Sequence, residues 1–342
     1  MDVKYVLLAF IICSLFNPLA IKIGNKYILD KPNKRKVHTI PKPRSGGIAI
    51  FLTILIFSFF NISVRGILLP IAIIFTIGIV DDIFSLPAKV KLLFQIIVAG
   101  ITYSLGYRID SVSLGHFNLN FTYLTPIVSI LWMVGMMNSI NLIDGLDGLA
   151  TSMVLISTLA FIFLTYDSTL IIPRIVVGIC LAFLRVNKCP AKVFLGDSGS
   201  LLLGFLLSVI AIQTIQINEY PQIIAVVFIV FVPVLDTTWA FLRRIINKKP
   251  VFSPDKEHLH HKILKALSKD DKTLMAIIIL SIYAAFIGIL LFIDLSIITI
   301  LLSLTLIPFT FIMYNFDKYS TLLLPFIDMK KEAAITKVNE NK

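Results

Sequence analysis

The sequence predicts an all-α protein that crosses a membrane about eleven times. Apolar residues make up 57% of the chain, charged residues make up only 15%, and the mean hydropathy is +0.92. An ordinary soluble domain carries about a quarter charged residues. Much of the surface is therefore expected to face lipid, in one transmembrane domain (1–315) followed by a cytoplasmic tail (316–342).

Eleven apolar stretches are candidate transmembrane helices, because about 20 apolar residues cross a bilayer and fewer suffice where neighbours help. The first follows only Asp2 and Lys4 and has no small-residue cleavage site after it, so we expect a retained helix rather than a signal peptide. The stretches cover residues 3–22, 47–62, 66–80, 90–106, 124–140, 148–166, 168–185, 199–216, 220–240, 273–292 and 295–314.

Basic residues indicate the orientation. They gather in 24–46, 186–192, 241–272 and the tail, whereas the alternate loops carry little more than Arg65 and Arg108. With eleven spans every basic segment falls on one side, which the positive-inside rule makes cytoplasmic. The amino terminus is then outside and the carboxyl terminus is in the cytoplasm. The net charge of +11 is explained by these loops, so we expect no nucleic-acid partner.

One outer segment, 108–121, alternates apolar and polar residues around Gly115-His116, which predicts a small β-hairpin. The three cysteines, Cys13, Cys180 and Cys189, show no pairing pattern. Neither a disulfide framework nor a thiolate zinc site is expected.

Ionisable and amide side chains collect at the predicted cytoplasmic edge. Placing such groups at a membrane costs several kcal/mol, so they are candidates for function. The expected active-site loops are 24–46, 81–91, 138–147, 186–198 and 241–272.

Asp81-Asp82 ends the third stretch. The pair could be solvated loop charge, but adjacent carboxylates repel and raise one pKa unless a cation is near. Lys89 and Lys91 follow in the same loop and could supply that cation.

Asn138, Asn141, Asp144 and Asp147 recur every three residues, a spacing that keeps side chains on one side of a helix. They could be a polar helix end facing water. The interleaved glycines favour function, because glycine lets backbone N–H groups approach a phosphate or base closely.

Asp197 opens the eighth stretch within Gly196-Asp197-Ser198. It could be an ordinary helix cap, or it could hold a metal that bridges to phosphate at the helix N-terminus.

The histidines lie in the large basic loop, where Ser253-Pro254 predicts a cap and a first helical position. The oxygen-rich surroundings favour magnesium over zinc. His258, His260 and His261, with Arg243-Arg244, suit a diphosphate as donors.

The basic loop from Lys31 to Gly47 can be read in two ways. It is either a topology signal alone or, through Gly46-Gly47, a site for a lipid phosphate or a nucleotide.

Taken together, these segments resemble the polyprenyl-phosphate N-acetylhexosamine-1-phosphate transferase superfamily (glycosyltransferase 4 family). The blocks follow the family's order over most of the chain. They are Arg35-Lys36-Val37-His38 with Pro43 to Gly47, Asp81-Asp82 with Lys91-Leu92 and Gln95, Asn138 to Leu149, Phe194 to Ser200, and Asp236 with Arg243-Arg244 and His258-Leu259-His260-His261.

Leu259 interrupts the histidine triplet, which is similar to the branch using UDP-GlcNAc and undecaprenyl phosphate at the start of O-antigen, common-antigen or teichoic-acid synthesis. The peptidoglycan branch, phospho-N-acetylmuramoyl-pentapeptide transferase, is the alternative. The resemblance implies a multi-pass enzyme of the cytoplasmic membrane whose active site faces the cytoplasm. It is also compatible with a homodimer.

The resemblance also implies roles for single residues, and Mg²⁺, with Mn²⁺ as a substitute, as the cofactor. The catalytic residues would be Asp81, Asp82 and Asp197, and the metal ligands Asp197 and Asn141. The nucleotide sugar would contact Asn138, Asp144, Asp147, Gly148 and Arg44, and the phosphates would contact Lys91, Arg243, His258, His260 and His261.

Two alternatives remain open, one for the reaction mechanism and one for the class of protein. An aspartate could form a phosphoryl-enzyme intermediate, although direct attack by the lipid phosphate is favoured. An anionic lipid or solute transporter would place its charges near mid-membrane, whereas here they cluster at one edge.

Overall fold

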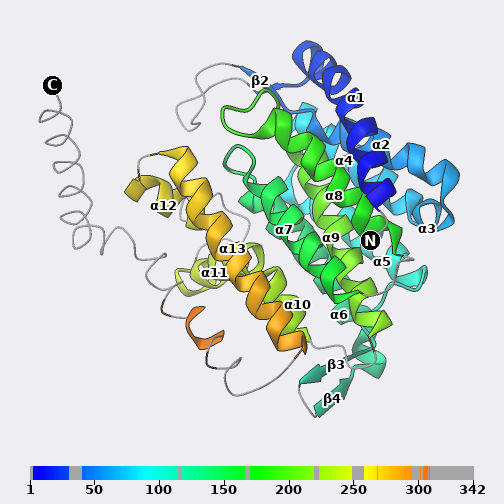
Figure 1. The fold of residues 1–342 in the computed structure, drawn as a ribbon, viewed down its shortest axis with the longest axis vertical. Coiled ribbons are helices and arrows are strands. Elements are labelled where there is room, and N and C mark those ends of the chain that lie inside the picture. Colours follow the sequence, from blue (N-terminus) through cyan, green and yellow to red (C-terminus); the bar gives the residue numbers. More distant parts are fainter. Residues whose placement is uncertain are drawn as a thin grey trace, which may run out of the picture.

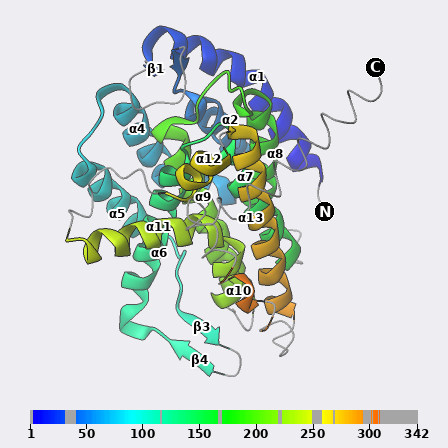
Figure 2. The same ribbon diagram turned by 90° about the vertical axis from the view of Figure 1, so that its left-hand side faces the viewer.

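The computed structural model is a bundle of helices with two small sheets near opposite ends (Figures 1 and 2). It describes residues 3–30, 41–114, 117–165, 170–218, 223–248, 258–267 and 269–293, with a few positions between 301 and 308. The helices are α1 (Val3–Tyr27), α2 (Gly46–Phe60), α3 (Ile62–Gly66), α4 (Leu68–Phe84), α5 (Ala88–Ser104), α6 (Thr125–Ile143), α7 (Leu149–Leu164), α8 (Ile171–Asn187), α9 (Gly196–Ile217), α10 (Ile223–Ile229), α11 (Phe231–Ile246), α12 (Leu259–Leu267) and α13 (Asp270–Ile293).

Four helical segments of the described chain are long and apolar enough to cross a bilayer, and the bent pair α10–α11 makes a fifth. The four are Val3–Tyr27, Thr122–Ile143, Gly196–Ile217 and Asp270–Ile293. The chain is therefore a helical, multi-pass membrane protein. Each of the first ten predicted stretches overlaps a helix, but the count of eleven and the orientation remain predictions. Most of 295–314 and all of the tail 316–342 lie outside the described residues.

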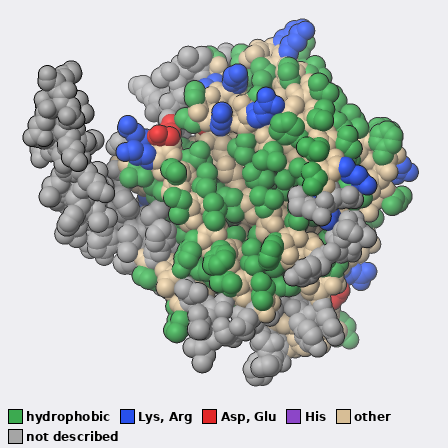
Figure 3. Space-filling model, viewed as in Figure 1, with side chains coloured by type: hydrophobic (Ala, Val, Ile, Leu, Met, Phe, Trp, Pro, Cys, Tyr) green, Lys and Arg blue, Asp and Glu red, His purple; other side chains and the backbone are tan. Residues whose placement is uncertain are grey.

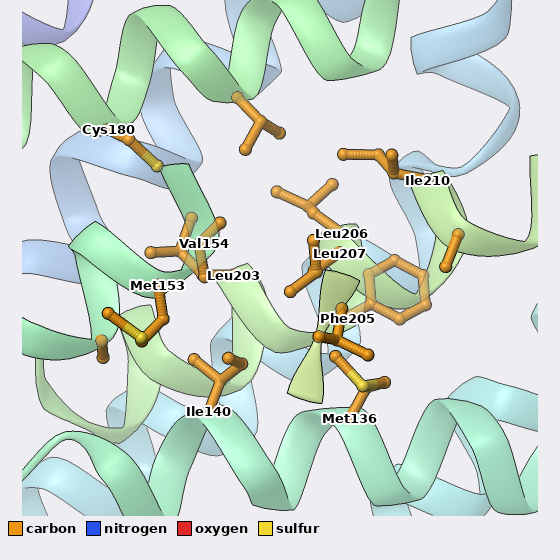
Figure 4. Close-up of a cluster of buried hydrophobic side chains, with 14 of the residues drawn as sticks. Met136, Ile140, Met153, Val154, Cys180, Leu203, Phe205, Leu206, Leu207 and Ile210 are labelled. Atoms are coloured by element: carbon orange, nitrogen blue, oxygen red, sulfur yellow. The ribbon is translucent and has the colours of Figure 1, made fainter. Parts of the chain in front are cut away.

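Helix α9 is the centre of the bundle. Almost all of its side chains are buried, and α2, α4, α6 and α7 pack around it. Its apolar residues meet those of α6, α7 and α8 in one continuous core (Figure 4). The outer helices instead expose apolar side chains such as Leu15, Phe60 and Leu131, and Figure 3 shows such side chains over much of one face. This is the burial pattern of one helix enclosed by lipid-facing neighbours.

The approach of α9 to α6 depends on Gly204. A β-carbon there would lie 2.8 Å from both the Met136 carbonyl oxygen and the Met137 Cα, which is closer than such atoms can approach. A small residue at a helix crossing lets two backbones meet in a membrane protein. The polar first turn of α9 is thereby fixed beside the end of α6.

The predicted span 220–240 is not one continuous helix. Helices α10 and α11 meet at 89°, and Figure 2 shows α11 running across the direction of α10. Pro233 has no N–H for the carbonyl of Ile229, four residues before it. Ser157 of α7 donates its hydroxyl to that carbonyl oxygen at 2.9 Å and is itself buried. The bend therefore leaves no unsatisfied carbonyl at Ile229.

The predicted hairpin segment contains two paired strands. Strand β3 (Ser111–Leu114) pairs antiparallel with β4 (Phe117–Asn120), with Val112 opposite Leu119. The turn at Gly115-His116 lies outside the described residues. The second sheet joins β1 (Leu29–Asp30) to β2 (Lys42–Pro43) near the other end of the bundle (Figure 1).

We expect Ser157→Ala to destabilise the protein, because it leaves the Ile229 carbonyl buried without a donor. The loss should be about 1–2 kcal/mol in the free energy of unfolding, measured by denaturant titration in detergent. Ser208→Ala is the matched control, since the buried Ser208 hydroxyl donates only to Phe205 O within its own continuous helix. Equal losses in the two variants would contradict this account of the bend.

Candidate active site

Four of the predicted active-site loops (24–46, 81–91, 138–147 and 186–198) meet beside the first turn of α9. Phe194 N donates to the carbonyl oxygen of Pro43 at 2.8 Å, and Gly46 N donates to Phe194 O at 3.0 Å. These bonds form a short parallel pairing around Arg44 and Phe194. The pairing joins the segment that follows β2 to the segment that precedes α9, although about 150 residues separate them in the chain.

Asp82 holds the N-terminus of α9 from a different helix, α4. One carboxylate oxygen accepts from Asp197 N at 2.8 Å, and the other accepts from Ser198 N at 3.0 Å and from the Ser198 hydroxyl at 2.8 Å. Its side chain has no exposed surface. Gly196 has φ +72°, and a β-carbon there would lie 2.6 Å from Asp82 Oδ2. In this geometry Asp82, predicted to be catalytic, is a helix cap rather than a group open to substrate.

Asp197 is held between two cations. Lys91 Nζ lies 2.8 Å from Asp197 Oδ2 and 3.1 Å from Asp81 Oδ2, so Lys91 bridges these two carboxylates. Arg44 approaches the other oxygen of Asp197 at 3.0 Å and Asp82 at 3.5 Å. The remaining oxygen of Asp81 accepts from Leu86 N at 2.7 Å. The structure thus brings Asp81, Asp82 and Asp197 together with the cation that the sequence suggested for the acidic pair.

The four residues spaced by three do not share one helix face, contrary to the sequence-based interpretation. Helix α6 ends at Ile143, so Asp144 is its C-cap and Asp147 lies in the following turn. Gly148, the N-cap of α7, has φ +79°, a left-handed conformation that glycine adopts with little strain. The four side chains consequently reach four different partners or environments.

Three of these four residues form hydrogen bonds or ion pairs with side chains or backbone of other segments. Asn138 exchanges hydrogen bonds with the buried Gln95 of α5, at 2.7 and 3.4 Å. Asn141 donates to Ser200 Oγ at 2.9 Å. Asp147 accepts from Ala191 N at 2.7 Å and lies 3.5 Å from Lys42 Nζ.

Gln95, Ser200 and Lys42 had no predicted role. Gln95 and Ser200 lie inside the family-like blocks, and Lys42 lies in the predicted loop 24–46. Sequence position alone could therefore have drawn attention to them.

The histidine segment is anchored by Asp236 of α11. One oxygen of Asp236 lies 2.9 Å from His258 Nδ1, and the other accepts from Leu259 N at 2.8 Å. His260 is buried against Gly145, where a β-carbon would lie 2.2 Å from its Nε2. Burial, with His261 and His258 nearby, lowers the pKa of His260 to about 3. His260 is therefore a neutral imidazole beside the Asp144 turn.

The described residues include only some of the other predicted features. Arg243 lies in the last turn of α11, and His261 follows His260 in α12. The predicted cap Ser253-Pro254 and the basic run Lys31 to Ile40 lie outside the described residues.

Carboxylates outnumber cations in the site. If all were ionised, Asp81, Asp82, Asp144 and Asp197 would face only Arg44 and Lys91. Burial, opposed by Arg44 and reinforced by Asp197, Asp82 and Asp147, raises the pKa of Asp144 to about 8. Without a cation, Asp144 therefore keeps its proton at neutral pH. A divalent cation would favour the ionised carboxylates and balance their charge.

The donor set fits magnesium rather than a metal held wholly by protein. Within the described residues, no group of three or more His, Cys, Asp or Glu side chains is arranged to hold a metal ion. Mg²⁺ is commonly bound by one or two carboxylates together with substrate phosphates. Asp197 and the free carbonyl oxygen of Asn141 could provide the protein's share.

Comparison with known proteins also indicates a sugar-1-phosphate transferase. Residues 64–215 match the model of glycosyl transferase family 4. The chain is 38% identical, over 75% of its length and 75% of the relative's, to a probable undecaprenyl-phosphate N-acetylglucosaminyl 1-phosphate transferase of Bacillus subtilis.

Two further relatives show the breadth of the similarity. An undecaprenyl-phosphate α-N-acetylglucosaminyl 1-phosphate transferase of Thermotoga maritima is 33% identical, over 82% of this chain and 87% of its own. A phospho-N-acetylmuramoyl-pentapeptide-transferase of Streptococcus equi is 35% identical, over 61% of this chain and 72% of its own.

We expect Asp82→Asn to lower the free energy of unfolding by about 2 kcal/mol, because an amide NH₂ would face the N–H donors of α9 in place of an oxygen. Denaturant titration in detergent measures this loss. The control is Asp271→Asn, which changes an exposed aspartate in the first turn of α13 and should have little effect. A stable Asp82→Asn variant would show that the cap contributes little.

We expect stability to fall as pH rises from about 4 to about 8, with Asp144 as one cause. In this range the folded protein keeps a proton on Asp144 that the unfolded chain has released, because the folded pKa is about 8 and the ordinary value is 3.8. One such group contributes a slope of at most about 1.4 kcal/mol per pH unit. Thermal midpoints in metal-free buffer at pH 5–8 should show a smaller slope for Asp144→Asn. An unchanged slope would contradict the raised pKa.

Proposed function

Since the chain belongs to glycosyl transferase family 4, among the polyprenyl-phosphate N-acetylhexosamine-1-phosphate transferases, we propose that it transfers GlcNAc-1-phosphate from UDP-GlcNAc to undecaprenyl phosphate. An oxygen of the lipid phosphate attacks the sugar-bearing phosphorus of UDP-GlcNAc. The bond from that phosphorus to the oxygen shared with the second phosphate breaks, and UMP leaves. The other product is undecaprenyl-diphospho-GlcNAc, the first lipid-linked intermediate of a cell-surface polysaccharide or teichoic acid.

The observation that carries this proposal is the Lys91 bridge between Asp81 and Asp197. Two phosphate-bearing anions must meet in this reaction, so positioning and charge neutralisation are the main tasks of the enzyme. Lys91 is only partly buried, which leaves it able to contact a phosphate while keeping both carboxylates in place. Asp81 would orient the lipid phosphate or accept its proton.

Asp197 and Asn141 would hold Mg²⁺ together with the diphosphate of the sugar nucleotide. Bound there, Mg²⁺ would neutralise negative charge on the transferred phosphoryl group and on the leaving UMP. The fit rests on the excess of carboxylates over cations in the cluster and on the carbonyl oxygen of Asn141. Asp82 would keep Asp197 in position by capping α9.

The turn Asp144 to Gly148, Arg44 and the α5–α6 pair at Asn138 surround the place where the nucleotide sugar would lie. Asp147 and Lys42 form one side of this region through their ion pair. Arg243, His258 and His261 remain proposed phosphate contacts. His260 would contribute a neutral N–H donor instead of a positive charge, because its imidazole is buried and unprotonated.

The contacts support direct attack over a phosphoryl-aspartate route. Asp81 has one oxygen on Lys91 and the other on Leu86 N, and the proposed role of Asp197 is to hold Mg²⁺. A nucleophilic carboxylate would first have to leave these partners. The lipid phosphate is already a nucleophile and needs only to be oriented.

We also propose the arrangement in the cell. The site would face the cytoplasm, where UDP-GlcNAc is found, in a single transferase domain (1–315) of the cytoplasmic membrane, and the protein would be able to form a homodimer. A transporter is the less favoured class, because the described ionisable cluster lies at one end of the bundle near β2 rather than at its middle (Figure 1).

We expect purified protein with undecaprenyl phosphate, Mg²⁺ and UDP-GlcNAc to release UMP and form a lipid-linked sugar. EDTA should stop the reaction, and Asp197→Asn should lower the rate at least a hundredfold. UDP-MurNAc-pentapeptide run in parallel tests the branch of the Streptococcus relative. Turnover with only that substrate would move the chain to the peptidoglycan branch. Release of UMP with neither substrate, by protein that remains folded, would contradict the transferase proposal.

A further inference from the structure

Lys91 lies on a helix that has few neighbours. Helix α5 packs mainly against α4 and α6, and it exposes apolar side chains such as Leu93 and Ile96 on its outer side. Lys91 nevertheless reaches Asp197 on α9, at 2.8 Å, as well as Asp81 on α4, at 3.1 Å. Direct packing of α5 against α9 therefore does not explain how the Lys91 ammonium group comes to lie between the two carboxylates.

Gln95 lies one helical turn after Lys91 on the same face of α5. It is 1% exposed and exchanges hydrogen bonds with Asn138 of α6, at 2.7 and 3.4 Å. In the described part of the chain, Lys91 and Gln95 are the only α5 side chains that hydrogen-bond to another helix. A buried amide is costly to leave unpaired, so α5 is held where Gln95 meets Asn138.

The two ends of this amide pair are fixed by a third group. Asn138 Nδ2 donates to the carbonyl oxygen of Val134 at 2.8 Å as well as to Gln95 Oε1. A backbone carbonyl can only accept, so the nitrogen of Asn138 must face it, and the oxygen of Gln95 must then face that nitrogen. Both hydrogens of the Asn138 amide are thus used within the protein, and the pair has a single orientation.

The pair continues a series of fixed contacts that runs from α9 to α5. Gly204 lets α9 approach the α6 backbone at Met136 and Met137, and Asn138 is the next residue of α6. Helix α6 is therefore fixed against α9 close to the position where it also holds α5. A helix α5 that could rotate or slide would carry the base of the Lys91 side chain away from the two carboxylates.

We propose that Gln95 is a positioning residue: by holding α5 on α6, it keeps Lys91 between Asp81 and Asp197. Gln95 is buried and would touch neither substrate nor metal. The inference deepens the proposed function and rests on it for its importance to the reaction, because Lys91 is the group proposed to contact phosphate. It also assigns the NH₂ group of Asn138 to the protein rather than to the nucleotide sugar.

The test measures how fast Lys91 reacts with a water-soluble N-acetylating reagent, on purified protein in detergent. An ammonium group held between two carboxylates reacts slowly, because acetylation needs the free amine. In Gln95→Met, which removes the amide from a side chain of similar length, Lys91 should be acetylated about fivefold faster. Loss of a buried hydrogen-bonded pair shifts a local opening equilibrium by about that factor. Mass spectrometry of peptide fragments locates the acetyl group.

Lys89 is the internal reference. It is exposed and lies two residues before Lys91 in the same helix, so it should react at the same rate in all variants. Asn138→Leu removes the pair from the α6 side and should accelerate Lys91 in the same way as Gln95→Met. Thr102→Val is the matched control, because the buried Thr102 hydroxyl donates to Val98 O within α5. Thermal midpoints show which variants are folded during labelling.

Activity separates this inference from the proposed function. Gln95→Met should release UMP from UDP-GlcNAc at least tenfold more slowly than the wild type, whereas Thr102→Val should match it. An unchanged ratio of Lys91 to Lys89 labelling in the folded variants would overturn the inference, as would equal acceleration at both lysines. A changed ratio, in a protein whose wild type releases UMP from neither sugar nucleotide, would support the positioning of Lys91 and contradict the proposed function alone.

Discussion

The cap that Asp82 places on α9 is the interaction on which the rest of the site depends. A buried carboxylate is tolerated in an apolar bundle only when its oxygens are satisfied, and here two backbone N–H groups, a hydroxyl and Arg44 satisfy them. Because the cap comes from α4, it fixes α9 against α4 at the turn that carries Asp197. The bridge by Lys91 and the pairing around Arg44 then follow from where that turn lies.

The aspartates of the site have two kinds of role. Asp82 and Asp236 each hold the N-terminal backbone of another helix, α9 and α12 respectively. Asp81 and Asp197 instead contact side-chain cations, and Asp144 lies beside them with a raised pKa. The first group fixes the geometry, and the second gives the site its charge. A substitution in either group would reduce activity, and one in the first group would also release the N-terminus of a helix.

Much of the fold could be predicted from the sequence, because hydropathy alone marks where helices form in a membrane protein. The clustering of acidic residues at one end and the presence of a cation near Asp81 could also be predicted from their loops. The bend at Val230 could not, since Pro233 is often tolerated within apolar helices and the compensating donor, Ser157, is far away in the chain.

The prediction that the residues from Asn138 to Asp147 share one helix face failed for a different reason. Its spacing of three suggested one helix face, whereas Gly145 and Gly148 in the same segment were the better signal, because glycine so often ends a helix. The cap by Asp82 was beyond prediction for another reason. Its donors lie 115 residues later in the chain, and nothing local identifies them.

The central position of α9 has a consequence for biogenesis. Its main neighbours α2, α4, α6 and α7 all precede it in the chain, so the ribosome makes them first. When α9 enters the membrane, Asp82 on α4 is already present to cap its first turn. The Met136–Met137 backbone of α6 is already present to receive Gly204. Helix α9 thus completes the cluster of Asp81, Asp82 and Asp197, and α11 and α12, which bring Asp236 and the histidines, follow it in the chain.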